Sequence, residues 1–394
     1  MNGGIRSYEF AKRLAEDGYD VHVITTDREN SFKGWREESL DGFTIHWVSV
    51  QYDNSFGFIA RVLAFFKFSI LAWLKLRSIK PQLNFATSTP LTIAIPAILA
   101  KLFFGIPYIF EVRDLWPDAP IKMGFLKHPV LIWLARKLEY YAYSCANHVI
   151  ALSPEMAKGV QVAGIEQSKI TVIPNASDVA LLRHSYDNQA QNFWQDKPLD
   201  PVRDQIVVYT GTIGVVNDLM YLVDLASSSL LYPQIKFAVF GQGAEKQKII
   251  DYAASKQVLN QNLFFFDPVP KQQLAYILAG AKMTMSLVAD IPALWGNSAN
   301  KFFDSFAATK PIMINHGGWQ ADVIQEYKCG LVVGRDTTQA SQSIHQMLND
   351  STALQHAAEQ SQYLGDCVFG RDVLYQKFKQ IFDQNIKNQE SSHV

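Results

Sequence analysis

The segment GGIRSYEFAKRLAEDGYDVHVIT, residues 3–25, decides the fold class. Apolar residues between Ile5 and Asp17 recur at helical spacing, and Gly18 follows where many helices end in glycine. The run Val21–Thr25 is apolar and β-branched, which is typical of a buried strand. A glycine pair, a helix and a buried strand in this order indicate one unit of a parallel α/β sheet.

The same alternation continues along the rest of the chain, with helical segments between short apolar runs. In the first half the predicted strands are Val21–Thr25, Thr44–Val50, Leu83–Thr87, Tyr108–Val112, His148–Ala151 and Ile170–Ile173. In the second half they are Ile206–Tyr209, Lys236–Phe240, Leu263–Phe266, Met283–Leu287, Pro311–Ile314 and Gly330–Val333. The pattern predicts an α/β protein built of two Rossmann-like, doubly wound domains.

The length of 394 residues exceeds what one hydrophobic core normally supports. Periodicity fades in a polar stretch after Asp178, so we predict a first domain over 1–180, a linker over 181–204 and a second domain over 205–368. No strand precedes Gly3 and Gly4, although such a glycine turn normally follows the central first strand. We therefore expect the first domain to lack this strand, through a start codon assigned too far downstream; the alternative is a flexible beginning.

Charge and cysteine content exclude several classes of protein. Lys plus Arg number 36 and Asp plus Glu 37, interspersed along the chain, which argues against a nucleic-acid partner. Cys145, Cys329 and Cys367 are too few and too scattered for a disulfide framework or a zinc knuckle. The first residues do not have the pattern of a secretory signal, so we expect a cytoplasmic protein.

Two apolar and cationic stretches in the first half suggest contact with a membrane surface. Residues 58–76 (FIARVLAFFKFSILAWLKL) are long enough to span a membrane but are interrupted by Arg61, Lys67 and Lys75, so we predict an interfacial helix. A helix that merely covers a sheet is the alternative. Residues 121–138 (IKMGFLKHPVLIWLARKL) add a second such stretch, and together they favour peripheral association with the inner membrane.

Glycine turns at strand ends and one charged strand end are the candidate functional motifs. Glycines recur at residues 3–4, 211–214 (GTIG) and 241–243 (GQG), where backbone amides and a helix N-terminus suit a diphosphate, although plain turn chemistry explains many such turns. The segment EVRDLWPD, residues 111–118, places an arginine, a tryptophan and two aspartates at the end of a strand. Such a strand end faces the ligand crevice of a parallel sheet, whereas the alternative is an ordinary surface turn.

The order of these motifs gives a specific resemblance. The chain resembles the retaining glycosyltransferases of family 4, especially the WbuB-like branch of bacterial surface-polysaccharide enzymes. The segments that carry this likeness are residues 3–25, 111–118, KLEYYAYSCANHVIALSPEM (137–156), ITVIPNASD (170–178), FAVFGQGAEKQKI (237–249) and NSANKFFDSFAATKPIM (297–313). The resemblance implies the GT-B architecture, in which two domains face a cleft and a last helix, here within 369–394, returns to the first domain.

The resemblance also implies roles for individual residues. Arg113 and Asp114 match the pair that orients the acceptor and the transferred sugar, and we expect them to be the catalytic residues. The residues expected to bind the donor are Gly3, Gly4, Asn175, Gly211, Thr212, Gly214, Gly241, Gly243, Phe266, Val269, Asn300, Lys301 and Asp304. Among these, the segment from Phe266 to Val269 matches the part whose backbone reads the base, and Asn175 has a structural turn role as its alternative.

The chain departs from the family at two places. The family's paired acids reduce to Asp304, expected on the ribose, because Gly296 occupies the position of the first acid. Residues 215–218 (VVND) replace the Arg/Lys pair that neutralises the diphosphate in many relatives. Lys301 is the substitute cation that we predict, and a solvated helix lysine is the alternative.

The resemblance implies transfer of a sugar, an N-acetylated aminosugar or deoxy-aminosugar, from a UDP-sugar to a lipid-linked oligosaccharide precursor of capsule, O-antigen or exopolysaccharide. No acidic cluster suggests a metal, so we expect neither metal nor cofactor. A UDP-sugar 2-epimerase of the same fold is one alternative, although EVRDLWPD contains no histidine for its acid–base chemistry. A non-catalytic partner of a membrane enzyme is the other, favoured by the altered phosphate motif.

Overall fold

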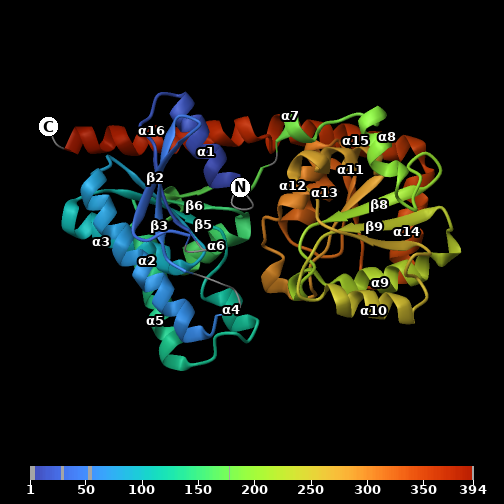
Figure 1. Ribbon diagram of the computed structural model, residues 1–394, viewed down its shortest axis with the longest axis horizontal. Coiled ribbons are helices and arrows are strands. Elements are labelled where there is room, and N and C mark those ends of the chain that lie inside the picture. Colours follow the sequence, from blue (N-terminus) through green and yellow to red (C-terminus); the bar gives the residue numbers. More distant parts are fainter. Residues whose placement is uncertain (1–4, 28–30, 52–55, 177, 393–394) are drawn as a thin grey trace. The chain divides into compact units, whose positions relative to one another are not determined.

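The computed structural model describes residues 5–27, 31–51, 56–176 and 178–392, and these form two compact units. The first unit comprises residues 1–174 and 375–394, and the second comprises 175–374. Figure 1 shows their elements in chain order. Both units are α/β, with parallel sheets and flanking helices, so the predicted pair of Rossmann-like domains is confirmed.

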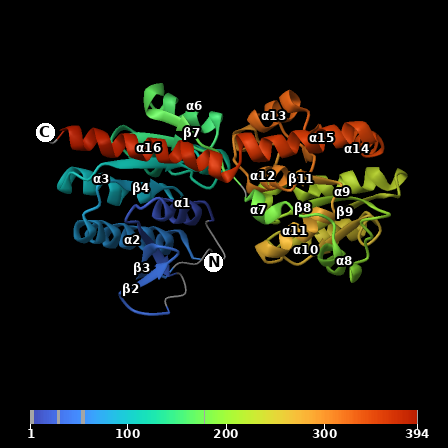
Figure 2. The same cartoon turned by 90° about the horizontal axis from the view of Figure 1, so that it is seen from above.

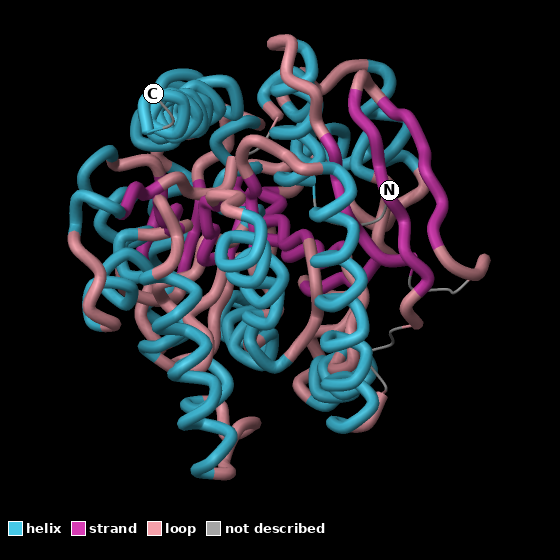
Figure 3. The backbone as a smooth tube through the Cα atoms, turned by 90° about the vertical axis from the view of Figure 1, so that its left-hand side faces the viewer, coloured by secondary structure: helices cyan, strands magenta, loops and turns pink. Residues whose placement is uncertain are grey.

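The first unit contains two sheets. The strands are β1 (His22–Asp27), β2 (Trp35–Leu40), β3 (Phe43–Ser49), β4 (Asn84–Thr87), β5 (Tyr108–Val112), β6 (His148–Ala151) and β7 (Ile170–Val172). One sheet has the order β1-β3-β2 and the other β4-β5-β6-β7, and only β2 is antiparallel to its neighbour. Among the described residues no strand joins β1 to β4, so the strands of this unit form two separate sheets. The strands of this unit can be followed from another side in Figure 3.

Seven α-helices of the first unit flank these strands within the described residues. They are α1 (Ile5–Glu16), α2 (Phe58–Ile79), α3 (Ala94–Phe104), α4 (Asp118–Lys122), α5 (Pro129–Ser144), α6 (Pro154–Val162) and α16 (Arg371–Ser392). From Tyr375 onward α16 packs on the first unit, where Phe378 stacks on Phe10 of α1 at 4.2 Å between ring centroids. Figure 2 shows α16 running beside α1 and β4. Because Lys379 pairs with Asp17 at 2.8 Å, polar contacts reinforce this apolar seam.

The second unit has a single parallel sheet with the order β10-β9-β8-β11-β12-β13. Its strands are β8 (Gln205–Thr210), β9 (Ile235–Phe240), β10 (Leu263–Phe266), β11 (Met283–Ser286), β12 (Ile312–Ile314) and β13 (Gly330–Val332). Its helices are α7 (Val179–Leu182), α8 (Asn188–Gln195), α9 (Leu219–Ser228), α10 (Lys246–Ser255), α11 (Lys271–Gly280), α12 (Asn300–Ala307), α13 (Trp319–Tyr327), α14 (Thr337–Asn349) and α15 (Ser351–Tyr363). Strands β8, β9 and β11 are almost wholly buried, as the apolar runs Ile206–Tyr209 of β8 and Phe237–Phe240 of β9 indicate.

The polar segment 181–204, predicted as a linker, is instead part of the second unit. Its helix α8 begins at Asn188, capped by the carboxylate of Asp187, and it carries the fully buried Trp194. The Trp194 indole packs among apolar side chains of β8 and β9 and donates a hydrogen bond to the Tyr276 carbonyl at 3.0 Å. One tryptophan therefore anchors a segment whose overall composition is that of a loop.

Candidate functional site

The carboxyl edge of the sheet in the second unit is the candidate donor site. The chain winds from β8 through β9 to β10 on one side, and β11 begins the other side of β8. Ligands of doubly wound sheets bind outside the carboxyl ends of strands at such a change of direction. The loops that follow β8 and β11 therefore border the expected donor pocket.

The two predicted glycine turns pack against each other at this edge. A Cβ added to Gly241 would lie 2.0 Å from the Gly211 carbonyl oxygen, and one added to Gly243 would lie 2.1 Å from that of Ile213. The amide of Gly211 donates to the Phe240 carbonyl at 2.9 Å. Close packing of the turns after β8 and β9 thus explains the glycines at 241 and 243. The same contacts fix the turn that contains Thr212 and Gly214.

Lys301 lies directly against the first glycine turn. It comes from the first turn of α12, and its Cε would be 3.3 Å from a Cβ at Gly211. Its ammonium donates to the Tyr209 hydroxyl at 3.2 Å and lies 4.6 Å from the centroid of the Tyr209 ring. Surrounding protein atoms withdraw the ammonium from water and lower the pKa of Lys301 to about 8, while Asp304 opposes this shift. Lys301 is half-buried against this turn, which favours the substitute cation over a solvated helix lysine.

Asn300 and Asp304 share α12 with Lys301. Asn300 is the first residue of the helix, and Asp304 lies about one turn further along. Asp304 is half-buried and near enough to act electrostatically on the Lys301 ammonium. The structure therefore groups these three predicted donor residues with the turn at Gly211.

Asn175 holds the loop that leads into α12. Its amide nitrogen donates to the Ser298 hydroxyl at 2.9 Å, and its side-chain Nδ2 donates to the Ser298 carbonyl at 2.7 Å. Its Oδ1 is buried and has no hydrogen-bond partner among the described residues. These bonds give Asn175 a structural role at the base of α12.

Phe266 and Val269 lie at the end of the edge strand β10. The Phe266 ring stacks on Phe240 with centroids 4.6 Å apart, and Val269 packs against the same apolar cluster. The Phe266 carbonyl accepts the Gly241 amide at 3.2 Å. This segment therefore adjoins the second glycine turn, where it is placed beside the other predicted donor residues.

Two features of this edge were missed in the sequence. Arg335 follows β13 and donates to Asp218 at 2.7 Å and to the Val288 carbonyl at 3.0 Å, so it links the loop after β11 to the segment that lost the family's cations. The pair Gly317-Gly318 joins β12 to α13, where Gly318 has a φ of 86°. Both features follow predicted strand ends, and this position in the sequence could have identified them as candidates.

The carboxyl edge of the four-stranded sheet in the first unit is the candidate acceptor site. Arg113 and Asp114 directly follow β5, and the Arg113 amide donates to the Ser88 hydroxyl at 3.0 Å, next to the end of β4. Beneath them the buried Glu111 pairs with Arg6 at 2.8 Å and accepts the Thr87 hydroxyl at 2.7 Å. This pair was not predicted; it braces the strand ends that present Arg113 and Asp114.

The two aspartates of EVRDLWPD, residues 111–118, have different electrostatic surroundings. Asp114 reaches the surface, yet the protein around it raises the pKa of its carboxyl, against the effects of Arg113 and the Thr89 hydroxyl. Asp118 instead pairs with Arg136 of α5 at 2.6 Å. Burial, aided by the charge of Asp118, also raises the pKa of Glu139 to about 7. Asp114 is therefore the aspartate of this loop that lies next to Arg113 and is not paired with Arg136.

Gly3 and Gly4 lie outside the described residues. Among the residues that are described, no group of three or more His, Cys, Asp or Glu side chains is placed to hold a metal ion.

Family comparisons assign both units. Residues 3–176 match the glycosyl transferase 4-like domain, and residues 190–363 match the glycosyl transferases group 1 family. The chain belongs to the GT-B glycosyltransferases. The comparison with curated proteins found no match.

Solved structures support the same fold for this glycosyltransferase. Sucrose-phosphate synthase from Thermosynechococcus elongatus has a TM-score of 0.77 at 15% identity, covering 97% of this chain and 93% of that one. HepE from Anabaena, in complex with UDP and glucose, gives 0.71 at 14% identity, with coverages of 97% and 96%. WaaG, a glycosyltransferase involved in lipopolysaccharide biosynthesis, gives 0.67 at 14% identity, with coverages of 96% and 95%.

Proposed function

We propose that this glycosyltransferase transfers a sugar from a UDP-sugar to a lipid-linked oligosaccharide precursor of a bacterial surface polysaccharide, with retention of anomeric configuration. The proposed sugar is an N-acetylated aminosugar or deoxy-aminosugar. The observation that carries the proposal is the half-buried ammonium of Lys301 against the Gly211 turn. It is the kind of group that a donor diphosphate requires.

The residues of the candidate donor site can stabilise the nucleotide as it leaves. As the glycosidic bond breaks, negative charge grows on the leaving diphosphate, and fixed amides and one nearby cation can stabilise that charge. Lys301 and the turn at Gly211 supply these groups without the Arg/Lys pair of other family members. The HepE complexes with UDP and with UDP-glucose favour a uridine donor for this fold.

The candidate acceptor site, in this proposal, binds the transferred sugar and the acceptor whose hydroxyl attacks it. Arg113 and Asp114 project from the end of β5, where the buried Arg6–Glu111 pair fixes the backbone. We assign them to orienting the acceptor and the transferred sugar. The acceptor hydroxyl attacks the anomeric carbon on the face that the diphosphate leaves, which keeps the anomeric configuration, and an oxygen of the leaving diphosphate takes the hydroxyl proton.

The apolar surface of the first unit supports a lipid-linked acceptor. Helix α2 has a buried apolar side and also an exposed stripe formed by Leu63, Phe66, Ile70 and Leu74. Exposed apolar side chains continue at Leu102 and Phe103 of α3, at Phe125, and at Val130, Leu131, Trp133 and Leu134 of α5. Helix α3 packs on both α2 and α5. Large exposed apolar areas of this kind mark interaction sites.

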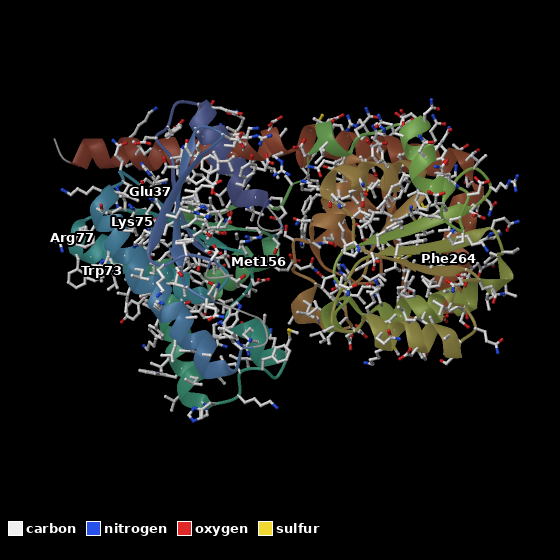
Figure 4. All side chains as sticks on the ribbon, in the orientation of Figure 1. Glu37, Trp73, Lys75, Arg77, Met156 and Phe264 are labelled. Carbon is white, nitrogen blue, oxygen red and sulfur yellow. The ribbon has the colours of Figure 1, made fainter. Side chains whose placement is uncertain are left out.

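Cations border this apolar surface. Arg61, Lys67, Lys127 and Lys137 are exposed on or beside α2 and α5. Lys75, predicted as part of the same set, is instead paired with Glu37 of β2 at 2.8 Å, as Figure 4 shows. No helix within the described ranges is long and apolar enough to cross a membrane. We therefore propose peripheral binding at the inner membrane surface, on the cytoplasmic side.

Two substitutions test the proposed chemistry. In Arg113→Ala or Asp114→Ala we expect transfer to a lipid-linked acceptor to fall at least about a hundredfold, because positioning groups are lost while donor groups remain. UDP affinity, measured by calorimetry, should change less than about twofold. Asp118→Ala, which removes the acid paired with Arg136, is the matched control and should retain transfer. Full transfer by the Arg113 or Asp114 variant would refute the assignment.

A further inference from the structure

The segment that follows the Gly211 turn carries an acid at the edge of the candidate donor site. Residues 215–218 (VVND) end in Asp218, which directly precedes the first residue of α9. The amino end of a helix that follows a sheet strand is a common place for a phosphate, because it carries partial positive charge. An unpaired carboxylate there would instead repel the diphosphate of a nucleotide sugar. Asp218 therefore requires a compensating cation if a diphosphate is to bind nearby.

Arg335 is the cation that meets Asp218. It lies just after β13, 117 residues further along the chain, and its Nη1 donates to Asp218 Oδ2 at 2.7 Å. The two side chains are only 31% and 28% exposed, so both charges are partly withdrawn from water. Within the described structure the carboxylate makes no capping hydrogen bond to α9 and is turned toward the guanidinium instead. A partly shielded pair is screened less by salt than a pair on the open surface.

The same guanidinium holds the loop after β11 against this segment. Its Nη2 donates to the Val288 carbonyl at 3.0 Å. The Val288 amide donates to Asn315 Oδ1 at 2.9 Å, and the Ala289 amide donates to the Val216 carbonyl at 2.8 Å. Residues that follow β8, β11, β12 and β13 therefore meet around Arg335, and these bonds fix the position of its charge.

We propose that Arg335 is a positioning residue for the donor and acts through Asp218. It cancels the charge of that acid and holds it away from the donor, so that the diphosphate meets the ammonium of Lys301 without an opposing carboxylate. The inference rests on the proposed function, because it concerns the diphosphate of the same nucleotide sugar. It accounts for donor binding by a chain that has an acid in the segment where many relatives carry an Arg/Lys pair.

The partners of Arg335 disfavour a direct contact with the diphosphate. Nη1 and Nη2 already donate to Asp218 and to the Val288 carbonyl, and Nε lies 3.9 Å from the exposed Asp290. A phosphate oxygen that displaced Asp218 would leave this carboxylate unpaired beside the diphosphate. Lys301 has a neutral acceptor instead, the Tyr209 hydroxyl, which a phosphate can replace without releasing an acid.

Calorimetric titration with UDP separates neutralisation from direct contact. In Arg335→Gln the unpaired Asp218 should weaken UDP binding about three- to tenfold at about 0.1 M salt. When Asp218→Asn is added to Arg335→Gln, both charges are gone, and the affinity should return to within about twofold of wild type. A direct ligand would not be rescued in this way. Arg203→Gln is the matched control, since Arg203 is exposed, pairs with Asp200 at 3.3 Å and precedes β8; it should bind UDP as wild type does.

Salt separates repulsion from a loss of structure. The Debye length falls from about 10 Å at 0.1 M to about 3 Å at 1 M salt, so repulsion by Asp218 is screened. The deficit of Arg335→Gln relative to wild type should therefore shrink to less than about twofold in 1 M sodium chloride. A deficit that persists there or in the double variant would overturn the proposal, as would wild-type affinity in Arg335→Gln. If the wild-type protein does not bind UDP, the proposed donor is itself wrong and this inference fails with it.

Discussion

Lys301 contributes both a positive charge and packing contacts to the candidate donor site. It is held by the hydroxyl and ring of Tyr209 beside the Gly211 turn. Burial of this ammonium costs free energy, which the charge of Asp304 on the next turn of α12 offsets only in part. A bound diphosphate would supply the missing charge. The residue is therefore arranged for a ligand at some cost to the empty protein.

The pKa of Lys301 predicts a pH dependence of donor binding. The pKa in the free protein is lowered to about 8, and a bound diphosphate favours the charged form and so raises it. Between these two pKa values binding must take up a proton, and affinity therefore falls as the pH rises above about 8. Calorimetric titration with UDP from pH 7 to pH 9.5 should show this decline.

Lys301→Met provides the check on this explanation. The variant has no ammonium to protonate, so its UDP affinity should be weak and nearly independent of pH over the same range. A wild-type affinity that stays constant up to pH 9.5 would mean that Lys301 does not contact the diphosphate.

Sequence reasoning found some of these residues and missed others for physical reasons. Lys301 was predicted because the family's cations were absent from residues 215–218 and it follows a recognisable motif. Arg335 and the Arg6–Glu111 pair were missed because their partners lie 117 and 105 residues away. Periodicity and local motifs report neighbours along the chain, whereas ion pairs of this kind depend on which strand ends the fold brings together.

At the scale of elements, the candidate donor site depends on the close packing of the turns after β8 and β9. The turns after β8 and β9 approach so closely that backbone oxygens lie where Cβ atoms at Gly241 and Gly243 would be. The sequence predicted glycine turns for anion binding, and the structure adds that two of the glycines are required by packing. Their presence alone is therefore weak evidence for a ligand.

Gly243→Ala should destabilise the second unit. The added Cβ would lie 2.1 Å from the Ile213 carbonyl oxygen, and the turn must move, at a cost of about 3 kcal/mol in the free energy of unfolding. Urea denaturation measures this change. Gly334→Ala is the control, since a Cβ at Gly334 has no heavy atom within 4 Å. Equal stability of both variants would contradict the close packing of the turns.

Elements with a clear pattern of apolar residues were predicted well, whereas elements that depend on contacts with distant parts of the chain were not. Strands β5, β6 and β10 have the predicted bounds because each is a short apolar run. Strand β2 was missed, since its sequence WREESL is polar and only its antiparallel pairing with β3 makes it a strand. Helix α8 was missed because its sequence is mostly polar and its buried residues are Ala190 and Trp194.

At the scale of the whole molecule, the first unit combines a candidate acceptor site with a candidate membrane surface. The apolar stripe of α2 is exposed although the opposite side of the same helix is buried, so packing inside this unit does not explain it. The sequence predicted an interfacial helix here but could not separate the two sides, since both are apolar.

Membrane binding should depend on this stripe. A variant with Leu63, Phe66 and Ile70 replaced by Gln should bind vesicles containing anionic lipid at least about tenfold more weakly than wild type, because three apolar side chains no longer enter the interface. Flotation with vesicles measures this. The control replaces Val162, Val202 and Leu231, which are exposed elsewhere. Equal loss in both variants would argue against a dedicated surface.

The most direct test of the account is a calorimetric titration of UDP into wild type, Lys301→Met and Lys310→Met at pH 7. Lys310 is also a half-buried lysine with a pKa lowered to about 8, but it precedes β12 and donates to the Ala279 carbonyl at 3.1 Å. We predict that Lys301→Met weakens binding by about ten- to a hundredfold, the effect of one charge-assisted contact, while Lys310→Met binds as wild type does. Unchanged binding in Lys301→Met, or no binding of UDP to the wild-type protein, would contradict a diphosphate site at the Gly211 turn.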